Sequence, residues 1–361
     1  MLQIVILVGL VLLVAILMAI FRISRLLNVA KGTDKEVVDK GSNSFNAILF
    51  IVFGVVTFGL FFWYSIVYYD EYTPPVASEH GVLTDGLFWT TMWVTGIVFI
   101  ITHILLFWFS YKYQYKKESS ALFFPHNNKL EVIWTVVPAI VLTILVFTGL
   151  KTWNDITDKA PEEAEVVEIM GYQFAWKTRY PGNDKQLGNY DFRLIDAENQ
   201  FGMDLTDKAS FDDFTPREIH IPKGQPVLFK IRARDVLHSV YAPHFRLKMD
   251  AVPGMQTNFW FVPTKSTAEM REETGNPEFN YEIACTEICG KGHFSMRMLV
   301  VVDEPEDYKK WLAEQESWLS KNETYLAKVP ANLKEEAKKA SGLNNTVEQP
   351  VSEVETTGAS M

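Results

Sequence analysis

The run Cys285-Thr286-Glu287-Ile288-Cys289-Gly290-Lys291-Gly292-His293-Phe294-Ser295-Met296 contains both cysteines of the 361-residue chain. Two thiols, one imidazole and one thioether within so short a run form a set of soft and borderline donors. Such donors favour copper, whereas a magnesium or calcium site would be rich in carboxylates. Methionine is a poor zinc ligand, which disfavours a zinc site. The run therefore predicts a copper site on a tight loop between two strands, where two cysteines could bridge two metal ions.

A disulfide between Cys285 and Cys289 is the simplest alternative, because cysteines four residues apart can pair in an oxidising compartment. His293 and Met296, which follow Cys289 by four and seven residues, favour the metal site over the disulfide. One more ligand must come from elsewhere in the chain. The candidates are His238, His220 and His244.

Short apolar or alternating runs, separated by Gly, Pro, Asn and Asp, surround this loop in the second half of the chain. They predict strands at Val166–Trp176, Glu218–Ile221, Val227–Ala233, Thr257–Val262, Asn280–Ala284 and Arg297–Val302. This spacing is typical of an antiparallel β-sandwich or barrel. Long loops with at most one strand are expected from Asp184 to Pro216. A helix is expected over Lys309–Leu333, and disorder from about Ala340 to Met361, where there is little to pack.

The first 150 residues are apolar and carry no net charge, so that the net charge of −10 resides entirely in the remainder. Four stretches approach the roughly 20 apolar residues that a bilayer core requires: about Leu2–Phe21, Ala47–Tyr69, Trp89–Ser110 and Val132–Leu150. The first could instead be a cleaved signal peptide, but it lacks a basic segment before its apolar run. Four retained transmembrane helices, followed by a water-exposed domain, fit the pattern better.

The distribution of Lys and Arg orients these helices. Both the segment between the first and second stretches and the segment between the third and fourth are basic, whereas Asp70–Phe88 contains no Lys or Arg. The positive-inside rule then places the N-terminus and everything after about Lys151 outside the cytoplasm. The acidic second half argues against a nucleic-acid partner, which needs a basic surface. Two cysteines are too few for a disulfide-dense secreted scaffold.

Two ionisable groups lie in or near these spans. Glu131, at the inner end of the fourth span, is either a solvated end residue or part of a proton path, since intramembrane carboxylates commonly mark such paths. His103, in the third span, is expected to make a hydrogen bond between helices.

Four motifs occur in an order that resembles subunit II of the cytochrome c oxidases of the haem–copper superfamily. They are the run Glu131–Ala139, the aromatic motif Gly171-Tyr172-Gln173-Phe174-Ala175-Trp176, the segment Asp235–His238 continuing to Leu247–Gly254, and the cysteine loop. The resemblance covers about Trp89 to Asp303. It implies a cupredoxin-type β-barrel with a binuclear copper centre, called CuA, that accepts electrons from cytochrome c and passes them to a haem of subunit I. Oxygen is then reduced to water in subunit I, with proton translocation across the membrane.

The resemblance also implies residue roles. Cys285 and Cys289 would bridge the two coppers, with His238, His293, the weak axial ligand Met296 and the backbone carbonyl of Glu287 completing the metal ligands. The Glu287 side chain would reach a magnesium ion shared with subunit I. Glu131 would lie at the mouth of a proton channel, and Trp176 and Phe174 would lie where the electron enters. Asp250 would lie near subunit I.

The chain departs from the family pattern at two positions and in its length. Phe174 replaces a tryptophan of the aromatic motif, and Met255 replaces the usual arginine after Pro-Gly. Two N-terminal helices are additional to the usual pair. Because the chain has no Cys-x-x-Cys-His motif, a separate cytochrome c or a haem subunit of a neighbouring complex is expected as donor.

The expected organisation is an extra helix pair over 1–70, a helix hairpin packing on subunit I over 71–152, an extracytoplasmic CuA domain over 153–305, and a C-terminal helix and tail over 306–361. The expected location is the bacterial inner membrane, with the copper domain on the periplasmic side. A membrane-anchored copper chaperone would need only one anchor and one copper. A nitrous oxide reductase would need more than the seven histidines present.

Overall fold

The computed structural model describes residues 2–31, 40–116 and 118–343. The disorder predicted from about Ala340 is wrong for Ala340 and Ser341, which end the helix Lys334–Ser341, and beyond residue 343 the prediction lies outside the described residues. Contacts divide the chain into two units, one formed by residues 1–69 with 95–127 and the other by residues 70–94 with 128–361.

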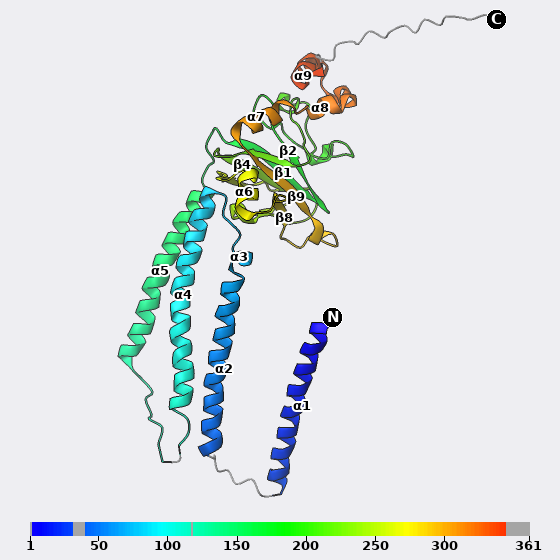
Figure 1. Cartoon of the computed structure of the whole chain (residues 1–361). Coiled ribbons are helices and arrows are strands. Elements are labelled where there is room, and N and C mark those ends of the chain that lie inside the picture. Colours follow the sequence, from blue (N-terminus) through cyan, green and yellow to red (C-terminus); the bar gives the residue numbers. More distant parts are fainter. Residues whose placement is uncertain (1, 32–39, 117, 344–361) are drawn as a thin grey trace, which may run out of the picture. The chain divides into compact units, whose positions relative to one another are not determined.

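Four helices are long and apolar enough to cross a membrane, as the sequence predicted. They are α1 (Leu2–Ala30), α2 (Lys40–Val67), α4 (Glu79–Lys112) and α5 (Asn128–Thr157), with the short α3 (Tyr69–Tyr72) after α2 (Figure 1). In the first unit, the Nδ1–H group of His103 on α4 donates to the Phe99 carbonyl of the same helix at 2.8 Å. The interhelical contact of this ring is an edge-on packing against Phe58 of α2, so the expected interhelical hydrogen bond is replaced by a ring contact.

The second unit contains a β-sandwich of two mixed sheets. One sheet has the order β2-β1-β4-β7 and the other the order β3-β9-β8-β5-β6. The strands are β1 (Glu165–Tyr172), β2 (Ala175–Arg179), β3 (Ile219–Pro222), β4 (Val227–Ala233), β5 (His238–Ala242), β6 (Leu247–Ala251), β7 (Thr257–Phe261), β8 (Tyr281–Cys285) and β9 (Arg297–Asp303). β1 runs parallel to β4, and β3 runs parallel to β9, so the predicted antiparallel pairing is wrong for these two pairs of strands. Alternate residues of each sheet, such as Val167, Ile169, Val240 and Ile283, are buried in one apolar core. The short α6 (Thr267–Thr274) lies between β7 and β8 in the chain.

The structure corrects the sequence prediction in three places. The expected strand Val166–Trp176 is a hairpin, because the chain reverses at Gln173 and Phe174 and Tyr172 pairs with Ala175. Two strands, β5 and β6, were not predicted. The expected helix over Lys309–Leu333 is divided into shorter helices, α7 (Pro305–Ala313), α8 (Trp318–Lys321), η5 (Glu323–Lys328) and η6 (Ala331–Leu333), followed by α9 (Lys334–Ser341). Pro330 cannot continue a helix, which explains one of these breaks.

A second apolar cluster joins the C-terminal helices to the outer face of the first sheet. Met170 of β1 packs there with Phe201, Phe211, Trp318 and Leu319. The segment from Asp184 to Pro216 thus forms part of a core, although it contains only short 3-10 turns, η1 (Phe192–Leu194) and η2 (Lys208–Ser210). Figure 1 shows α7, α8 and α9 beside this insertion at one end of the sandwich.

A buried cluster of charged side chains lies between this insertion and the sheet. The Glu168 carboxylate accepts hydrogen bonds from the guanidinium groups of both Arg179 and Arg232, and Arg179 Nη1 also donates to Asp213 Oδ2 at 2.9 Å. All four side chains are at most 5% exposed. Burial acts to raise the pKa of Glu168, but the two arginines outweigh it and lower that pKa, which keeps Glu168 ionised.

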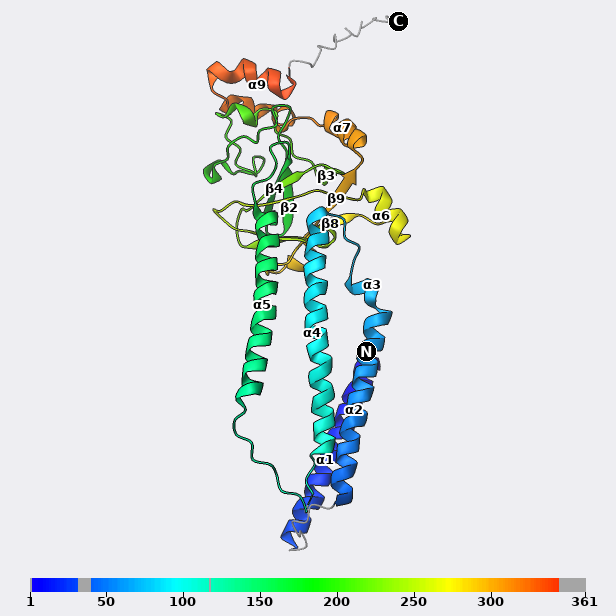
Figure 2. The ribbon, with the colours of Figure 1, turned by 90° about the vertical axis from the view of Figure 1, so that its left-hand side faces the viewer.

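The N-terminal end of α4 is fastened to the sandwich within the second unit. Arg246 Nε donates to Asp85 Oδ1 at 2.7 Å, and the Arg246 guanidinium also donates to the carbonyl of Pro74. The segment before α4 pairs with the domain backbone, since Ala77 N donates to His244 O at 2.8 Å and Thr264 N donates to Ala77 O at 2.9 Å. α4 therefore begins, and α5 ends, at the β-sandwich (Figure 2).

We expect a pH-dependent contribution to stability from His220. Its Nδ1 lies 2.7 Å from Asp303 Oδ2, and its ring stacks on Trp311 of α7 at 4.4 Å. Burial lowers the pKa of His220, but the hydrogen bond and charge of Asp303, aided by Glu218, raise it overall. Because the folded-state pKa exceeds the unfolded value of about 6.5, this stabilisation is complete below pH 6.5 and disappears as pH rises through the folded-state pKa.

Urea unfolding of the full chain in detergent at several pH values tests this expectation. The difference in unfolding free energy between the wild type and His220→Gln should shrink as the pH rises from 6 to 9. A difference that stays constant over this range would contradict the assignment.

Candidate metal centre

The predicted metal ligands come together at one end of the sandwich. His238 is the first residue of β5, Cys285 is the last residue of β8, and Cys289 lies in the loop that follows β8. His293 begins the short turn η4 (His293–Ser295), and Met296 precedes β9. The Cys285 N–H group donates to Met296 O at 3.0 Å, which closes the loop at its base. The neighbouring strands β5 and β8, with the loop that connects β8 to β9, therefore supply every side-chain ligand that the sequence predicted.

The donor atoms are separated by similar distances. Cys285 Sγ lies 3.9 Å from Cys289 Sγ and 3.8 Å from His238 Nδ1. Cys289 Sγ lies 3.6 Å from His293 Nδ1 and 3.8 Å from Met296 Sδ. The carbonyl oxygen of Glu287 lies 3.3 Å from Cys285 Sγ. Each thiol thus has one imidazole nitrogen beside it.

These distances fit a metal-binding arrangement. Metal–sulfur bonds of about 2.3 Å and metal–imidazole bonds of about 2.0 Å place two ligands of a tetrahedral ion about 3.6 to 3.8 Å apart. Thiolate, imidazole and thioether donors together are the set that copper prefers. His238, Cys285 and Cys289 also form a buried group whose ligand atoms lie within 4.8 Å of one another. The residues present therefore fit copper.

The protonation of the thiols links metal binding to pH. Burial, together with the neighbouring Cys285, raises the pKa of Cys289 to about 11. Without metal this thiol is therefore protonated at neutral pH. Binding as a thiolate must release its proton, so a metal ion competes with protons for this site.

Asp235 holds the His238 ring in the orientation that a metal ligand needs. The His238 Nε2–H group donates to Asp235 Oδ1 at 2.9 Å, which leaves the lone pair of Nδ1 directed toward Cys285. The same carboxylate accepts from the Gln173 and Val236 N–H groups at 2.7 and 2.8 Å. Burial acts to raise the pKa of Asp235, but these three hydrogen bonds outweigh it and lower that pKa.

Gln173 connects the β1–β2 hairpin to the metal loop. Its Nε2 donates to the Cys289 carbonyl at 2.7 Å, while its N–H group donates to Asp235. No role for Gln173 or Asp235 follows from the sequence pattern alone. The three-residue spacing of Asp235 and His238 is the one local sign in the sequence that these two side chains could interact. Gln173 gives no such sign, because it contacts Asp235 and Cys289 across the fold.

The two aromatic residues of the hairpin lie differently. Trp176 is buried, and its Nε1–H group donates to the Met296 carbonyl at 3.3 Å, while its ring is edge-on to His238 at 5.9 Å. Phe174 is 38% exposed and packs against the metal loop. A Cβ atom added at Gly292 would lie within 2.8 Å of Phe174, so only glycine fits beneath this ring.

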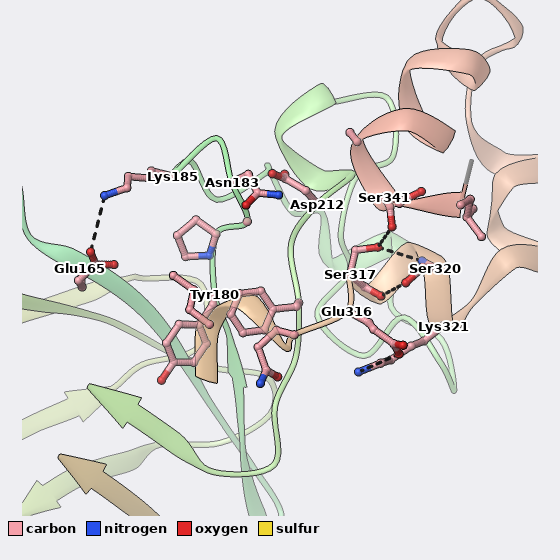
Figure 3. Close-up of a pocket in the computed structure, with 18 of the residues that line it drawn as sticks. Glu165, Tyr180, Asn183, Lys185, Asp212, Glu316, Ser317, Ser320, Lys321 and Ser341 are labelled. Carbon is pink, nitrogen blue, oxygen red and sulfur yellow. Dashed lines mark hydrogen bonds and ion pairs between the residues drawn. The ribbon is translucent and has the colours of Figure 1, made fainter. Parts of the chain in front are cut away.

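The other residues with a predicted role or a departure from the family pattern, Glu131, Asp250 and Met255, are not among the sulfur and nitrogen donors described above. Glu131 is in the first turn of α5. Asp250 is exposed on β6, and Met255 is exposed in the connection between β6 and β7. A separate cavity of about 550 Å³ lies between the end of β2 and the C-terminal helices (Figure 3). Glu165, Asn183, Asp212 and Ser317 are among its lining residues, and none of the predicted site residues lines it.

Comparison with known proteins gives a consistent result in two regions of the chain. Residues 165–303 match the family described as the periplasmic domain of cytochrome c oxidase subunit II, and residues 65–152 match the transmembrane domain of the same subunit. An alternative cytochrome c oxidase subunit 2 of Bradyrhizobium diazoefficiens is 34% identical over 274 residues, which cover 75% of this chain and 91% of that protein. A cytochrome c oxidase subunit 2 of Thermostichus vulcanus is 25% identical, over 73% of this chain and 84% of that protein.

A solved structure of the periplasmic domain of subunit II of cytochrome oxidase from Bradyrhizobium japonicum is 22% identical, with a TM-score of 0.30. The aligned region covers 44% of this chain and 95% of the solved domain. The two family matches and the 34% identical relative are sufficient, without this solved structure, to assign the chain to a family. The chain belongs to the cytochrome c oxidase subunit II family.

Proposed function

We propose that this chain carries a binuclear copper centre held by Cys285, Cys289, His238, His293, Met296 and the backbone carbonyl of Glu287. As a subunit II, the chain is the part of a cytochrome c oxidase that receives electrons, and it is a membrane protein with an extracytoplasmic domain. Copper bound here would take up and release one electron at a time. The observation that supports the proposal best is the pair of thiols 3.9 Å apart, each with an imidazole nitrogen within 3.8 Å.

The chain's own residues keep the ligands still while electrons pass. The loop is closed at its base by the Cys285–Met296 backbone hydrogen bond, and Gln173 holds the Cys289 carbonyl. Trp176 covers His238 and fixes the Met296 carbonyl. A rigid ligand frame changes its bond lengths little when the charge changes, which favours fast electron transfer.

Copper content and an EPR spectrum of the full-length chain in detergent test the proposal. We expect two copper ions per chain and hyperfine structure from one unpaired electron shared by both nuclei. One localised copper, or a Cys285–Cys289 disulfide without copper, would favour the chaperone or a structural subunit instead.

Replacement of Asp235 by alanine should weaken copper binding about 10- to 100-fold, because a metal-ligating histidine loses the partner that orients its ring. Competition with a chelator measures the affinity. Asp250→Ala, which removes an exposed carboxylate on the neighbouring strand, is the matched control. Equal affinities in the two variants would show that Asp235 does not position His238.

We further propose that the Glu287 side chain reaches a magnesium ion shared with subunit I. Phe174 and Trp176 are proposed to lie on the route by which electrons arrive. The donor would be a separate cytochrome c or a haem subunit of a neighbouring complex, and the location would be a bacterial inner membrane. The organisation into a helix pair (1–70), a hairpin on subunit I (71–152), a copper domain (153–305) and a C-terminal segment (306–361) also stays a proposal.

Glu131 is proposed to lie at the mouth of a proton channel that leads into subunit I. Proton transfer by a positioned side chain contributes about 10²-fold or more, so Glu131→Gln should lower oxidase turnover at least about tenfold. Copper content should remain unchanged, because Glu131 lies on α5 and away from the metal loop. Oxygen consumption by the purified complex provides the measurement, with Glu118→Gln in the preceding loop as control. Normal turnover of the Glu131 variant would exclude the channel assignment.

A further inference from the structure

An apolar cavity of about 500 Å³ lies between α2 and the C-terminal half of α4, within the first unit of the chain (Figure 1). Its lining is almost wholly apolar, and four of its side chains are aromatic: Phe58 and Phe62 of α2, and Phe107 and Trp108 of α4. Cavities of this size between helices, with apolar walls and few polar groups, are typical of small-molecule sites. The aromatic walls suit a ligand that contains a flat ring.

Close packing of the two helices forms this cavity before any ligand binds. Gly54 of α2 lies so near the Phe107 ring that a Cβ atom added there would be 2.8 Å from it. The Phe107 ring also packs against Phe50, at 4.7 Å between ring centroids, and edge-on against Phe58, at 6.2 Å. Phe58 in turn contacts Phe99 of α4 at 5.4 Å. A continuous row of aromatic rings therefore holds the two helices together along the cavity.

His103 brings a hydrogen-bond acceptor into the cavity. It supplies the only side-chain acceptor among the described residues that line it, since the Trp108 indole can only donate. The Phe99 carbonyl can only accept, so the His103 nitrogen bonded to it, Nδ1, carries the proton. In the neutral ring the other nitrogen, Nε2, then has a free lone pair. Nε2 has no hydrogen-bond partner among the residues that the structure describes.

This acceptor lies where neither water nor lipid can satisfy it. About 14 Å of helix separates His103 from Lys112, the last residue of α4, so the ring lies within the apolar span. Lipid chains at this depth offer no donor, and a polar group without a partner in hydrocarbon is costly. A transmembrane helix of another subunit is larger than this cavity, whereas a substituted six-membered ring fits within it. The geometry therefore favours a flat ligand that brings an O–H group to Nε2.

We propose that the cavity between α2 and α4 binds the reduced form of a membrane quinone, a hydroquinone with an isoprenoid tail. The ring lies among Phe58, Phe62 and Phe107, and one of its hydroxyl groups donates to His103 Nε2. The oxidised form has carbonyl oxygens in place of these hydroxyl groups, and a carbonyl cannot donate. Binding at this site therefore distinguishes the two redox states of one lipid-soluble carrier. No electron transfer is part of the proposal, which goes beyond the function of the copper centre.

Binding of decylubiquinol and decylubiquinone to the full-length chain in phosphatidylcholine nanodiscs tests the proposal. The metal centre is reduced and the reductant removed beforehand, under argon, so that no quinol is oxidised during the measurement. Each tritium-labelled probe is equilibrated with nanodiscs that contain the chain and with empty nanodiscs, and the difference gives the bound amount. We expect a single saturable site per chain that binds the quinol about tenfold more tightly than the quinone, because the quinone leaves Nε2 unpaired.

Two pairs of variants separate the hydrogen bond from the shape of the cavity. His103→Phe keeps an aromatic ring against Phe58 but removes the acceptor, so its affinities for the two probes should agree within about twofold. The same substitution at His126, in the loop after α4, should keep the preference for the quinol. Ile104→Trp fills the cavity and should weaken binding of both probes at least about tenfold. Ile101→Trp is its control, because Ile101 lies on α4 but does not line the cavity.

The proposal is overturned if the wild-type chain binds both probes equally, or binds neither beyond empty nanodiscs, since the cavity then holds lipid chains. Binding by the chain alone that is lost in the purified oxidase complex would assign the cavity to a helix of another subunit, with the same consequence. Nitrogen-15 labelling of histidine adds a direct readout. The Nε2 resonance that His103→Phe lacks should shift with the quinol and stay in place with the quinone. Copper content does not enter these measurements, so their failure leaves the proposed function unaffected.

Discussion

Replacing Cys289 by serine should leave at most one copper ion per chain and abolish the EPR signature of an electron shared between two nuclei. In the proposed centre both thiolates would be needed to hold two ions, and a serine hydroxyl is a hard, weakly acidic donor that copper does not prefer. Cys289 also lies within 3.8 Å of both His293 Nδ1 and Met296 Sδ, so its loss separates these two ligands from Cys285. Electron transfer from any cytochrome c should fall below detection.

The control for this variant is Ser295→Ala, which changes an exposed residue of the same loop and leaves every proposed ligand in place. It should retain two copper ions and the shared-electron spectrum. Near-ultraviolet circular dichroism should show that both variants keep their tertiary packing, because serine is close to cysteine in size and leaves the rest of the sandwich core in place. A Cys289→Ser protein that still held two coupled copper ions would refute the ligand assignment.

Replacing Arg179 by methionine should destabilise the sandwich by about 3 to 5 kcal/mol, because it leaves buried carboxylates without their cation. Glu168 would keep only Arg232, and Asp213 would lose its one guanidinium partner. Burial raises the pKa of Asp213 and Arg179 opposes this rise, so Asp213 depends on Arg179 for its charge; its Oδ1 atom has no hydrogen-bond partner among the described residues. Urea unfolding of the full chain in detergent gives the free energy.

Lys185→Met is the matched control for the arginine. Lys185 pairs with Glu165 at 3.7 Å on the same side of the domain, but its side chain is 77% exposed. An exposed pair of this kind contributes about 0 to 1 kcal/mol. Equal unfolding free energies for Arg179→Met and Lys185→Met would mean that the buried cluster does not stabilise the fold.

The metal loop could be predicted from the sequence because its side-chain ligands, apart from His238, lie within one short run. Donor chemistry alone selected copper for Cys285, Cys289, His293 and Met296. His238 was different, since three histidines were possible and only the family resemblance favoured it. The structure gives the physical reason: the first residue of β5 lies beside the last residue of β8, a neighbour that no local spacing reveals.

Other features depend on contacts between distant parts of the chain. The hairpin turn at Gln173 is hidden in the sequence because it lies within a mostly apolar run, and it forms because Gln173 bonds to Asp235 and to Cys289. The buried charges of Glu168, Arg179 and Arg232 alternate with apolar residues and are indistinguishable in sequence from a solvated strand face. Their burial follows from the segment between Asp184 and Pro216, which the sequence predicts only as loops, and from the C-terminal helices, which together cover that face.

Arg246, Asp85 and the backbone pairing around Ala77 hold the start of α4 rigidly against the sandwich. The domain with the metal loop therefore does not hang from α4 on a flexible linker. Electron tunnelling slows exponentially with distance, so a domain that swung on a loose linker would deliver electrons at widely varying rates. Because the domain is held in place, the donor must diffuse to it, and the electron-transfer distance is the same at every encounter. Differences between donors in electron delivery should then come from how often they dock and how long they stay, not from motion of the domain.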